Sequence, residues 1–313
     1  MSKEQNTKSK KLAKPFLKWV GGKSQLLDTF QKFYPNQLKE GQLQHFCEPF
    51  LGGGAVFFDV VQKFDLKSAK LFDINKELIL TYRVVQKEVN LMMEFLERYA
   101  NEYLKLDLEG QKEYYYEFRT NFNHQRFNVD YKRYNENWIP RAAQLIFLNK
   151  TCFNGLFRVN QKGEFNTPSG AYKNHLPKIL DEPNLKLASE VLSIADIEPA
   201  DFKIIEEKIA ETSFIYFDPP YRPLNKTSSF TNYSKKNFDD ELQFQLAEVF
   251  KKMDKKGNLV MLSNSDPKNQ DEADTFFDDL YAGYDIQRVK ANRVINSKVS
   301  KRGRINEIVV RNY

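Results

Sequence analysis

The stretch "LQHFCEPFLGGGAVFFDVVQKFDLKSAKLFDIN" (43–75) decides the fold. Residues 43–50 form an apolar pattern typical of a strand, which runs into the turn Gly52-Gly53-Gly54. The pattern then predicts a helix over 55–64 and a second strand over 69–75. Strands that alternate with helices favour a mostly parallel sheet, in which ligands bind at the carboxyl ends of the strands.

The rest of the chain continues this alternation around a helical insertion. The stretch "LFRVNQKGEFNTP" alternates apolar and polar residues around Lys162-Gly163, which predicts a hairpin within 155–170. The pattern at 181–197 is compatible with either a helix or a strand. Further helices are expected at about 76–100, 111–122, 138–149, 239–256 and 268–280, and further strands at 213–218, 258–264 and 307–313.

These elements predict an α/β fold divided into three parts. Residues 1–13 are expected to be a disordered basic tail. Residues 14–80 and 181–313 are expected to form one βα scaffold, and the mostly helical insertion at 81–180 is expected to carry the hairpin.

Composition indicates a globular protein with a sizeable core. The chain has 313 residues, of which 41% are hydrophobic and 29% charged, with a mean hydropathy of −0.63. No apolar run approaches the roughly 20 residues that a membrane helix needs, so no membrane partner is expected. Two cysteines, Cys47 and Cys152, cannot staple a chain of this size, which favours a cytoplasmic location.

Positive charge is placed unevenly. Residues 1–23 hold seven lysines and one glutamate, which together account for the whole net charge of +6. Such a start is typical of a solubilising tail, but it would also suit a polyphosphate partner. A second basic stretch, 288–304, has seven lysines and arginines and no acid, which fits either a solvated loop or a track for phosphates.

The glycine turn and the acid after it indicate a cofactor site. Three glycines after a strand allow the backbone to approach a ligand, but the spacing matches neither a phosphate loop nor a dinucleotide fingerprint. Asp73 ends the next strand about 20 residues later, where an acid can hold the two hydroxyls of a ribose. Together they suggest a nucleoside-containing cofactor; a plain turn followed by a solvated aspartate is the alternative.

The motif Asp218-Pro219-Pro220-Tyr221 directly follows the apolar strand "FIYF". Two prolines give up their backbone donors, which leaves carbonyl acceptors beside one carboxylate and one aromatic ring. Asp218 and the Pro219 carbonyl could accept both N–H bonds of an exocyclic amine, and Tyr221 could stack on the base. A proline-terminated strand with a solvated aspartate is the alternative.

A family resemblance rests on four motifs in fixed order. The motifs are "FLKWVGGKSQLL" (16–27), "EPFLGGGAVFF" (48–58), "DIN" (73–75) and "DPPY" (218–221). This set resembles the DNA adenine methylase (Dam) family, and the likeness spans about 14–313. It implies a Rossmann-like methyltransferase sheet with a helical DNA-recognition insertion, and transfer of a methyl group from S-adenosylmethionine to N6 of a flipped adenine.

The resemblance also implies site residues. Asp218, Pro219, Pro220 and Tyr221 match the catalytic motif. The residues that match cofactor-contacting motifs are Trp19, Lys23, Phe50, Gly52, Gly54, Asp73, Ile74, Asp196, Ile197 and Asp218. No metal is expected.

The stretch "KTCFNGLFRVNQKGEFNTPSGAYKN" (150–174) is similar to the DNA-reading hairpin of the GATC-specific members. The likeness implies that an aromatic wedge, polar and basic readers and an apolar pair contact DNA. These residues are Lys18, Phe153, Asn154, Leu156, Arg158, Pro168 and Tyr172. Arginine and lysine suit the guanine edge, and apolar groups suit the thymine methyl. Ala171 departs from the pattern, because related hairpins often carry arginine there.

Competing functions differ in the groups they need. Carbon-5 cytosine methylation would need a nucleophilic cysteine, and neither Cys47 nor Cys152 fits that role. N4-cytosine methylation presents similar geometry, and DPPY rather than SPPY favours adenine. A non-catalytic DNA-binding protein on the same fold is a further alternative, and methylation of RNA or of protein glutamine would not need the hairpin.

The expected partner is double-stranded DNA, bound by a monomer. A cognate restriction endonuclease acting separately is compatible with the sequence, as is a solitary regulatory role.

Overall fold

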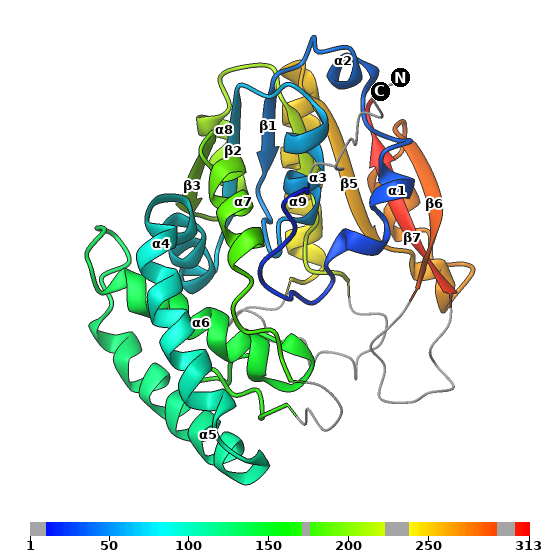
Figure 1. Cartoon of the computed structure of the whole chain (residues 1–313). Coiled ribbons are helices and arrows are strands. Elements are labelled where there is room, and N and C mark those ends of the chain that lie inside the picture. Colours follow the sequence, from blue (N-terminus) through cyan, green and yellow to red (C-terminus); the bar gives the residue numbers. More distant parts are fainter. Residues whose placement is uncertain (1–10, 171–175, 223–237, 293–303) are drawn as a thin grey trace, which may run out of the picture.

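A computed structural model describes residues 11–170, 176–222, 238–292 and 304–313, and within them one seven-stranded sheet lies at the centre (Figure 1). The strand order is β3-β2-β1-β4-β5-β7-β6. Neighbouring strands from β3 to β5 are parallel, whereas β7 runs antiparallel to both β5 and β6. The strands are β1 (His45–Glu48), β2 (Ser68–Asp73), β3 (Ala195–Pro199), β4 (Phe214–Phe217), β5 (Leu259–Ser265), β6 (Asp285–Asn292) and β7 (Arg304–Arg311). The predicted α/β class is confirmed.

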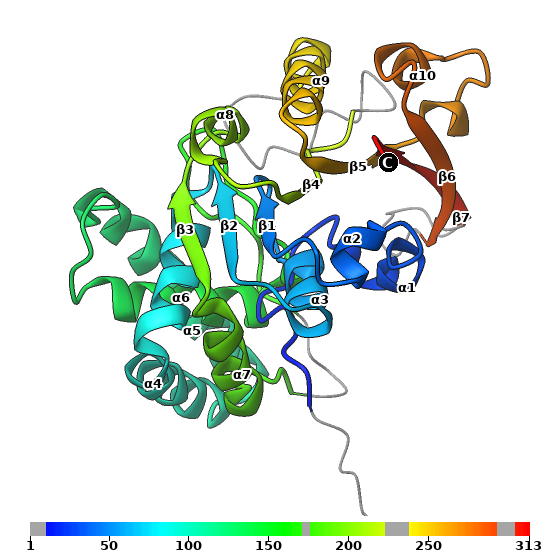
Figure 2. The ribbon, with the colours of Figure 1, turned by 90° about the horizontal axis from the view of Figure 1, so that it is seen from above.

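Helices cover both faces of the sheet. Seen from above, α3, α4 and α7 lie on one face and α8, α9 and α10 on the other (Figure 2). The α-helices are α1 (Leu27–Phe30), α2 (Asn36–Lys39), α3 (Ala55–Lys63), α4 (Lys76–Leu104), α5 (Leu108–Gln125), α6 (Trp138–Thr151), α7 (Glu182–Leu192), α8 (Ile205–Lys208), α9 (Asp240–Lys255) and α10 (Phe276–Leu280). None of the helices in the described ranges is both long and apolar enough to span a bilayer.

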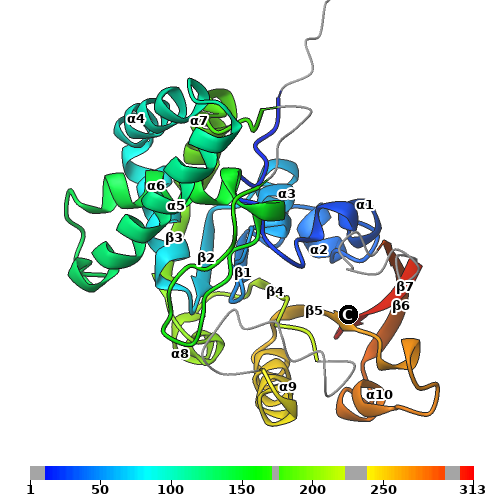
Figure 3. The same cartoon turned by 90° about the horizontal axis from the view of Figure 1, so that it is seen from below.

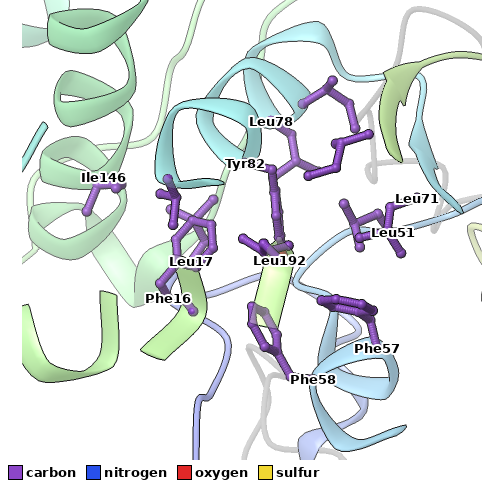
Figure 4. Packing of buried hydrophobic residues seen from close by; sticks show 14 of the residues in the cluster. Phe16, Leu17, Leu51, Phe57, Phe58, Leu71, Leu78, Tyr82, Ile146 and Leu192 are labelled. Atoms are coloured by element: carbon purple, nitrogen blue, oxygen red, sulfur yellow. The ribbon is translucent and has the colours of Figure 1, made fainter. Parts of the chain in front are cut away.

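The N-terminal segment is part of the core rather than an appendage. Phe16 and Leu17 are buried and pack among side chains of α3, α4 and α7, including Phe58, Tyr82 and Leu192 (Figure 4). The packing begins at Ala13, which is buried and whose N–H donates to the side chain of Gln62. Burial therefore starts at Ala13, one residue after the exposed Leu12, and this places the residues that follow beside the sheet.

A helical lobe formed by α4, α5 and α6 stands beside the β3 edge of the sheet (Figure 3). A buried ion pair holds this lobe together: Arg141 of α6, whose side chain is 3% exposed, contacts Glu77 in the first turn of α4 through Nε (3.0 Å) and Nη2. The guanidinium also donates to the Phe122 carbonyl of α5 at 2.5 Å and lies over the Phe122 ring. One arginine thus connects all three helices.

Helix α5 holds the stretch that contains the predicted hairpin. The Asn123 side chain donates to the Phe165 carbonyl (3.0 Å) and accepts from the Phe165 N–H (2.8 Å), as a neighbouring strand would. Tyr115 and Arg119 both donate to the Thr167 carbonyl. The hairpin prediction is confirmed, because Val159 and Phe165 form an antiparallel bridge.

Two predicted elements differ from the structure. The ambiguous stretch 181–197 divides into helix α7 and the start of strand β3. The helix predicted over 268–280 is wrong: only a 3-10 turn (Pro267–Asn269) and α10 are helical. The side chains of Asp271 and Asp274 accept from the N–H groups two residues on, and such local bonds compete with a helix.

The basic stretch 288–304 also differs in part from its interpretation as a solvated loop or a phosphate track. Residues up to 292 belong to strand β6, which the sequence analysis did not predict. Arg288 is engaged within the protein, because it forms ion pairs with Asp266 (3.0 Å) and Asp278 (2.7 Å). Residues 293–303 lie outside the described ranges, so the phosphate track stays a prediction there.

Replacing Arg141 by methionine should destabilise the fold by about 3 kcal/mol or more, because Glu77 loses a buried partner and the Phe122 carbonyl loses a donor. Urea unfolding measures this loss. Lys112→Met is the matched control, since its pair with Glu109 is exposed and should contribute less than about 1 kcal/mol. Equal losses in the two variants would show that Arg141 does not connect the helices as described.

Candidate active site

The parallel strands bring three acidic residues to one edge of the sheet. Glu48 ends β1, Asp73 ends β2, and Asp218 follows the last residue of β4. Because β1 pairs in parallel with both β2 and β4, these three ends point the same way. Ligands of open α/β sheets bind at this edge.

Lys23 from the N-terminal segment enters this acidic edge. Its side chain is 5% exposed, and its ammonium lies 2.8 Å from Asp218 Oδ1 and 2.6 Å from the Gly21 carbonyl. The same ammonium lies 4.6 Å from the centroid of the Tyr221 ring. One cation therefore touches both the carboxylate and the aromatic ring of the DPPY motif.

Asp218 is held by one further donor from β5. Ser263 Oγ lies 3.2 Å from Asp218 Oδ1 and 2.7 Å from Tyr216 Oη. Burial raises the pKa of Asp218, while Lys23 and the hydrogen bond from Ser263 act in the opposite direction. Both contacts fall on Oδ1, so within the described residues Oδ2 has no hydrogen-bond donor.

The backbone after Asp218 is also anchored. The side chain of Gln243, on α9, donates to the Pro220 carbonyl at 3.4 Å, and Ser265 Oγ donates to the Arg222 carbonyl at 3.4 Å. The Arg222 guanidinium pairs with Asp240 and Asp274. Within the described ranges nothing donates to the Pro219 carbonyl, so this acceptor is available to a ligand.

The glycine turn is shaped by the aromatic ring above it. A Cβ on Gly52 would lie 2.9 Å from Trp19 Cδ1, closer than side chains tolerate. At Gly54 the backbone is left-handed (φ +67°), and a Cβ there would meet Tyr82 Oη at 2.8 Å. Trp19 in turn stacks on Phe157 of the hairpin stretch, with ring centroids 5.3 Å apart. The predicted cofactor loop and the predicted DNA reader thus share one aromatic contact.

Asp73 faces this glycine turn. Its carboxylate accepts the Gly52 N–H (3.0 Å) on one oxygen and the Asn75 N–H (2.9 Å) on the other. Burial raises the pKa of Asp73, and these two backbone donors oppose that rise. A carboxylate has about four acceptor positions, so two remain for hydroxyl groups. The next residue, Ile74, is 63% exposed beside it.

Glu48 is a member of the site that the sequence analysis quoted but did not assign. It is 2% exposed, and its Oε2 accepts the Phe57 N–H of α3 at 3.0 Å. Burial raises the pKa of Glu48 well above its ordinary value, and the nearby charge of Asp218 adds to the rise. The position of this acid at the end of β1, matching those of Asp73 and Asp218, was the available signal.

The structure does not bring Asp196 and Ile197 to this edge. Asp196 pairs in register with Lys70, well before the carboxyl end of β3, and its side chain is 54% exposed. Ile197 is buried in the core. Because 181–197 was ambiguous in sequence, the strand end was placed too early in the chain.

An acid and an aromatic residue do lie at the end of β3, namely Asp201 and Phe202. The Ala200 N–H donates to the Asp73 carbonyl at 3.1 Å, which places these residues next to Asp73. Phe202 stacks on Phe50, with ring centroids 5.4 Å apart. The signal for this pair was an acid close to the carboxyl end of a strand, as at Asp73.

The loop before the hairpin is tied to the N-terminal segment by a buried amide. Asn149 of α6 accepts the Lys18 N–H (2.8 Å) and donates to the carbonyls of Lys18 (2.9 Å) and Gly155 (3.0 Å). A Cβ on Gly155 would lie 2.4 Å from Lys18 Cδ. Lys18 is therefore placed directly against the predicted reader.

The other predicted DNA-contacting residues gather around this loop. Phe153 is 49% exposed and its N–H donates to the Pro168 carbonyl at 2.9 Å. Asn154 is the one non-glycine residue in the described ranges with a left-handed backbone (φ +56°), a strain often found at functional sites. Arg158 donates to the Asn166 side chain across the hairpin at 2.8 Å.

Leu156 is half-buried, and Pro168, whose carbonyl accepts from Phe153, is exposed. Tyr172 and Ala171 lie outside the described residues.

Both thiols are unsuited to nucleophilic catalysis. Cys47 and Cys152 are buried, and burial raises the pKa of each, that of Cys152 to about 12. The reactive form of cysteine is the thiolate, which such a thiol does not form at neutral pH. This supports the exclusion of carbon-5 cytosine chemistry.

Comparisons with known proteins agree over nearly the whole chain. A family model described as D12 class N6 adenine-specific DNA methyltransferase matches residues 19–295. The chain is 48% identical over 301 residues to the Type II methyltransferase M.MjaIII of Methanocaldococcus jannaschii, covering 96% of this chain and 99% of the relative. It is 38% identical to the Type II methyltransferase M1.LlaDCHI of Lactococcus lactis subsp. cremoris, covering 98% of each. With the DNA adenine methylase of Haemophilus influenzae the identity is 33%, covering 98% of this chain and 96% of the relative.

Replacing Glu48 by glutamine should stabilise the protein at pH 8. The folded-state pKa of this carboxyl is raised, so wild type loses stability as pH rises above the ordinary range of glutamate, about 4.3, whereas the amide does not titrate. The glutamine oxygen can still accept the Phe57 N–H.

Urea unfolding at pH 8 and pH 5 tests this expectation: the advantage of the variant should shrink at the lower pH. Glu97→Gln, on an exposed position of α4, is the control and should change stability little at either pH. A Glu48→Gln variant less stable than wild type at pH 8 would contradict the prediction.

Proposed function

The chain belongs to the D12 class of N6 adenine-specific DNA methyltransferases, and from this premise we propose that it methylates an adenine flipped out of double-stranded DNA within GATC. The family description specifies N6 of adenine, so the N4-cytosine and non-catalytic alternatives are not retained. The observation that carries the proposal is the contact of Lys23 with both Asp218 and Tyr221 at the carboxyl edge of the sheet.

The residues at the glycine turn fit S-adenosylmethionine, the methyl donor that a methyltransferase of this family implies. Gly52 lets the Trp19 ring pack directly on the glycine turn, which a side chain there would prevent, and Asp73 keeps acceptor positions for ribose hydroxyls. Asp218, which already pairs with the Lys23 ammonium, provides a carboxylate that favours a cationic ligand. When bound, the cofactor supplies a methyl group on a sulfonium, which is reactive without a covalent enzyme intermediate.

Asp201 and Phe50 extend this cofactor site. Asp201 is exposed next to Asp73, and Phe50 packs on Phe202 at the same edge. We therefore assign the acidic contact to the cofactor base to Asp201 in place of Asp196. Ile74, exposed beside Asp73, is the apolar surface for that base.

The target base would take the place of the Lys23 ammonium. An adenine that donates to Asp218 and stacks on Tyr221 has to lie between these two groups, where the ammonium now lies. Asp218 Oδ2 and the Pro219 carbonyl are both available to accept from the two N–H groups of N6. Held in this way, the amine directs its lone pair away from both acceptors, and orientation of this kind can supply much of a rate enhancement.

The loop around Phe153 is the proposed DNA reader. Base flipping leaves a gap in the duplex, and the exposed ring of Phe153 on a loop held by Asn149 suits a wedge that fills it. Lys18 and Arg158 offer donors for guanine O6 and N7, and Leu156 with Pro168 offers apolar contacts for the thymine methyl. Tyr172 keeps its predicted role as a DNA contact.

Incubation with tritiated S-adenosylmethionine and duplexes with or without GATC tests the reaction and its sequence. Label should enter N6-methyladenine only in the GATC duplex, which should then resist a GATC endonuclease that N6-methyladenine blocks. Asp218→Ala should lower the single-turnover rate by about 100-fold or more while DNA binding persists. Asp65→Ala, at an exposed turn, is the matched control. Equal labelling of both duplexes would refute GATC.

The assignment of Asp201 is tested by cofactor binding alone. Asp201→Ala should weaken binding of S-adenosylmethionine by roughly tenfold, the usual size for one lost hydrogen bond to a charged group. Asp196→Ala, on the same strand but away from the edge, should bind like wild type. Calorimetric titration without DNA gives both values. A weaker Asp196→Ala together with an unchanged Asp201→Ala would restore the original assignment.

A further inference from the structure

The orientation of the Tyr221 ring is not fixed by the contacts that hold its backbone. Contacts from Gln243 to Pro220 and from Ser265 to Arg222 hold the chain on both sides of this residue. None of these contacts acts on the ring, which can rotate about two side-chain bonds. A base can stack only if the ring keeps one orientation, so something has to hold the ring itself.

Two side chains from the described part of the chain contact Tyr221 beyond its backbone. Lys23 approaches its face, with the ammonium 4.6 Å from the centroid, and Glu307 accepts from Tyr221 Oη through Oε2 at 2.6 Å. By the proposed mechanism Lys23 has to leave when adenine enters, because both occupy the space between Asp218 and the ring. Only the contact with Glu307, at the far end of the ring, can persist while the base is bound.

Glu307 is well placed for this role. It lies within β7, opposite Ser265 of β5 and Val289 of β6, so strands on both sides fix its backbone. A hydrogen bond between a neutral hydroxyl and a carboxylate is charge-assisted, which makes it shorter and stronger than one between neutral groups. Burial raises the pKa of the Tyr221 phenol well above its ordinary value, and the charges of Asp218 and Glu307 add to this. The hydroxyl therefore stays protonated and donates throughout.

We propose that Glu307 is a positioning residue for methyl transfer: it holds the Tyr221 hydroxyl so that the ring is already oriented for the flipped adenine. The inference rests on the proposed role of Tyr221 as the stacking partner. The negative charge beside the hydroxyl also enriches the ring in electron density, which favours its contact with Lys23 before the base arrives.

The test compares Glu307→Ala, Glu307→Gln, Tyr221→Phe and the double variant Glu307→Ala/Tyr221→Phe. In single turnover with a GATC duplex and saturating S-adenosylmethionine, Glu307→Ala and Tyr221→Phe should each slow transfer 10- to 100-fold, as expected for a hydrogen bond to a charged group. The double variant should be no slower than either single variant, because both remove the same bond. Glu307→Gln, whose amide oxygen can accept, should recover most of the rate.

A second readout separates ring orientation from a general loss of structure. With 2-aminopurine in place of the target adenine, the flipped base should fluoresce more strongly in Glu307→Ala than in wild type. A Tyr221 ring without a fixed orientation stacks less on the base and therefore quenches its fluorescence less. The KM for S-adenosylmethionine should stay unchanged.

Wild-type rates and emission in Glu307→Ala would overturn the inference, as would losses that add up in the double variant. If Glu307→Ala fails to fold, the single-turnover rates of Tyr221→Phe and Glu307→Gln provide the test. A full wild-type rate in Tyr221→Phe would then overturn the inference. Failure of wild type to methylate the GATC duplex would overturn the proposed function instead.

Discussion

The ion pair between Lys23 and Asp218 joins two parts of the chain that are almost 200 residues apart in sequence. Three strands end in buried acids at one edge of the sheet, and such acids repel one another unless a cation or a ligand lies among them. Lys23 supplies that cation, and it opposes the rise that burial causes in the pKa of both Asp218 and Glu48. For Lys23 to reach the edge, the segment before it has to cross the core, which explains why Phe16 and Leu17 are buried.

The same segment connects the DPPY motif to the proposed DNA reader. Between Phe16 and Lys23 lie Trp19, which covers the glycine turn and stacks on Phe157, and Lys18, which Asn149 ties to the hairpin loop. The glycine turn, the DPPY motif and the proposed reader therefore meet around eight consecutive residues. We expect changes in this segment to affect cofactor binding and DNA recognition together, because it contributes side chains to both.

Much of this arrangement could be predicted, and the failures have physical causes. Strands β1, β2, β4 and β5 were recognisable because they are largely apolar and end in, or are directly followed by, an acidic residue. Strand β6 was not, since it lies at the sheet edge and most of its residues are polar or charged. The helix predicted over 268–280 does not form as one element, because aspartate side chains accept hydrogen bonds from nearby backbone N–H groups. The predicted end of β3 lay a few residues too early in the chain. For this reason Asp196, rather than Asp201, was predicted at the ligand-binding edge of the sheet.

The motifs by themselves determined the α/β class, the order of the elements and the chemistry of the DPPY turn, because these depend on local pattern and residue type. Only the tertiary structure decided which groups meet. The pairing of Lys23 with Asp218, of Asn149 with Lys18 and of Glu307 with Tyr221 joins residues 195, 131 and 86 positions apart in sequence. No local pattern encodes such contacts, since they arise from the register of the parallel strands and from the packing of the helices against them.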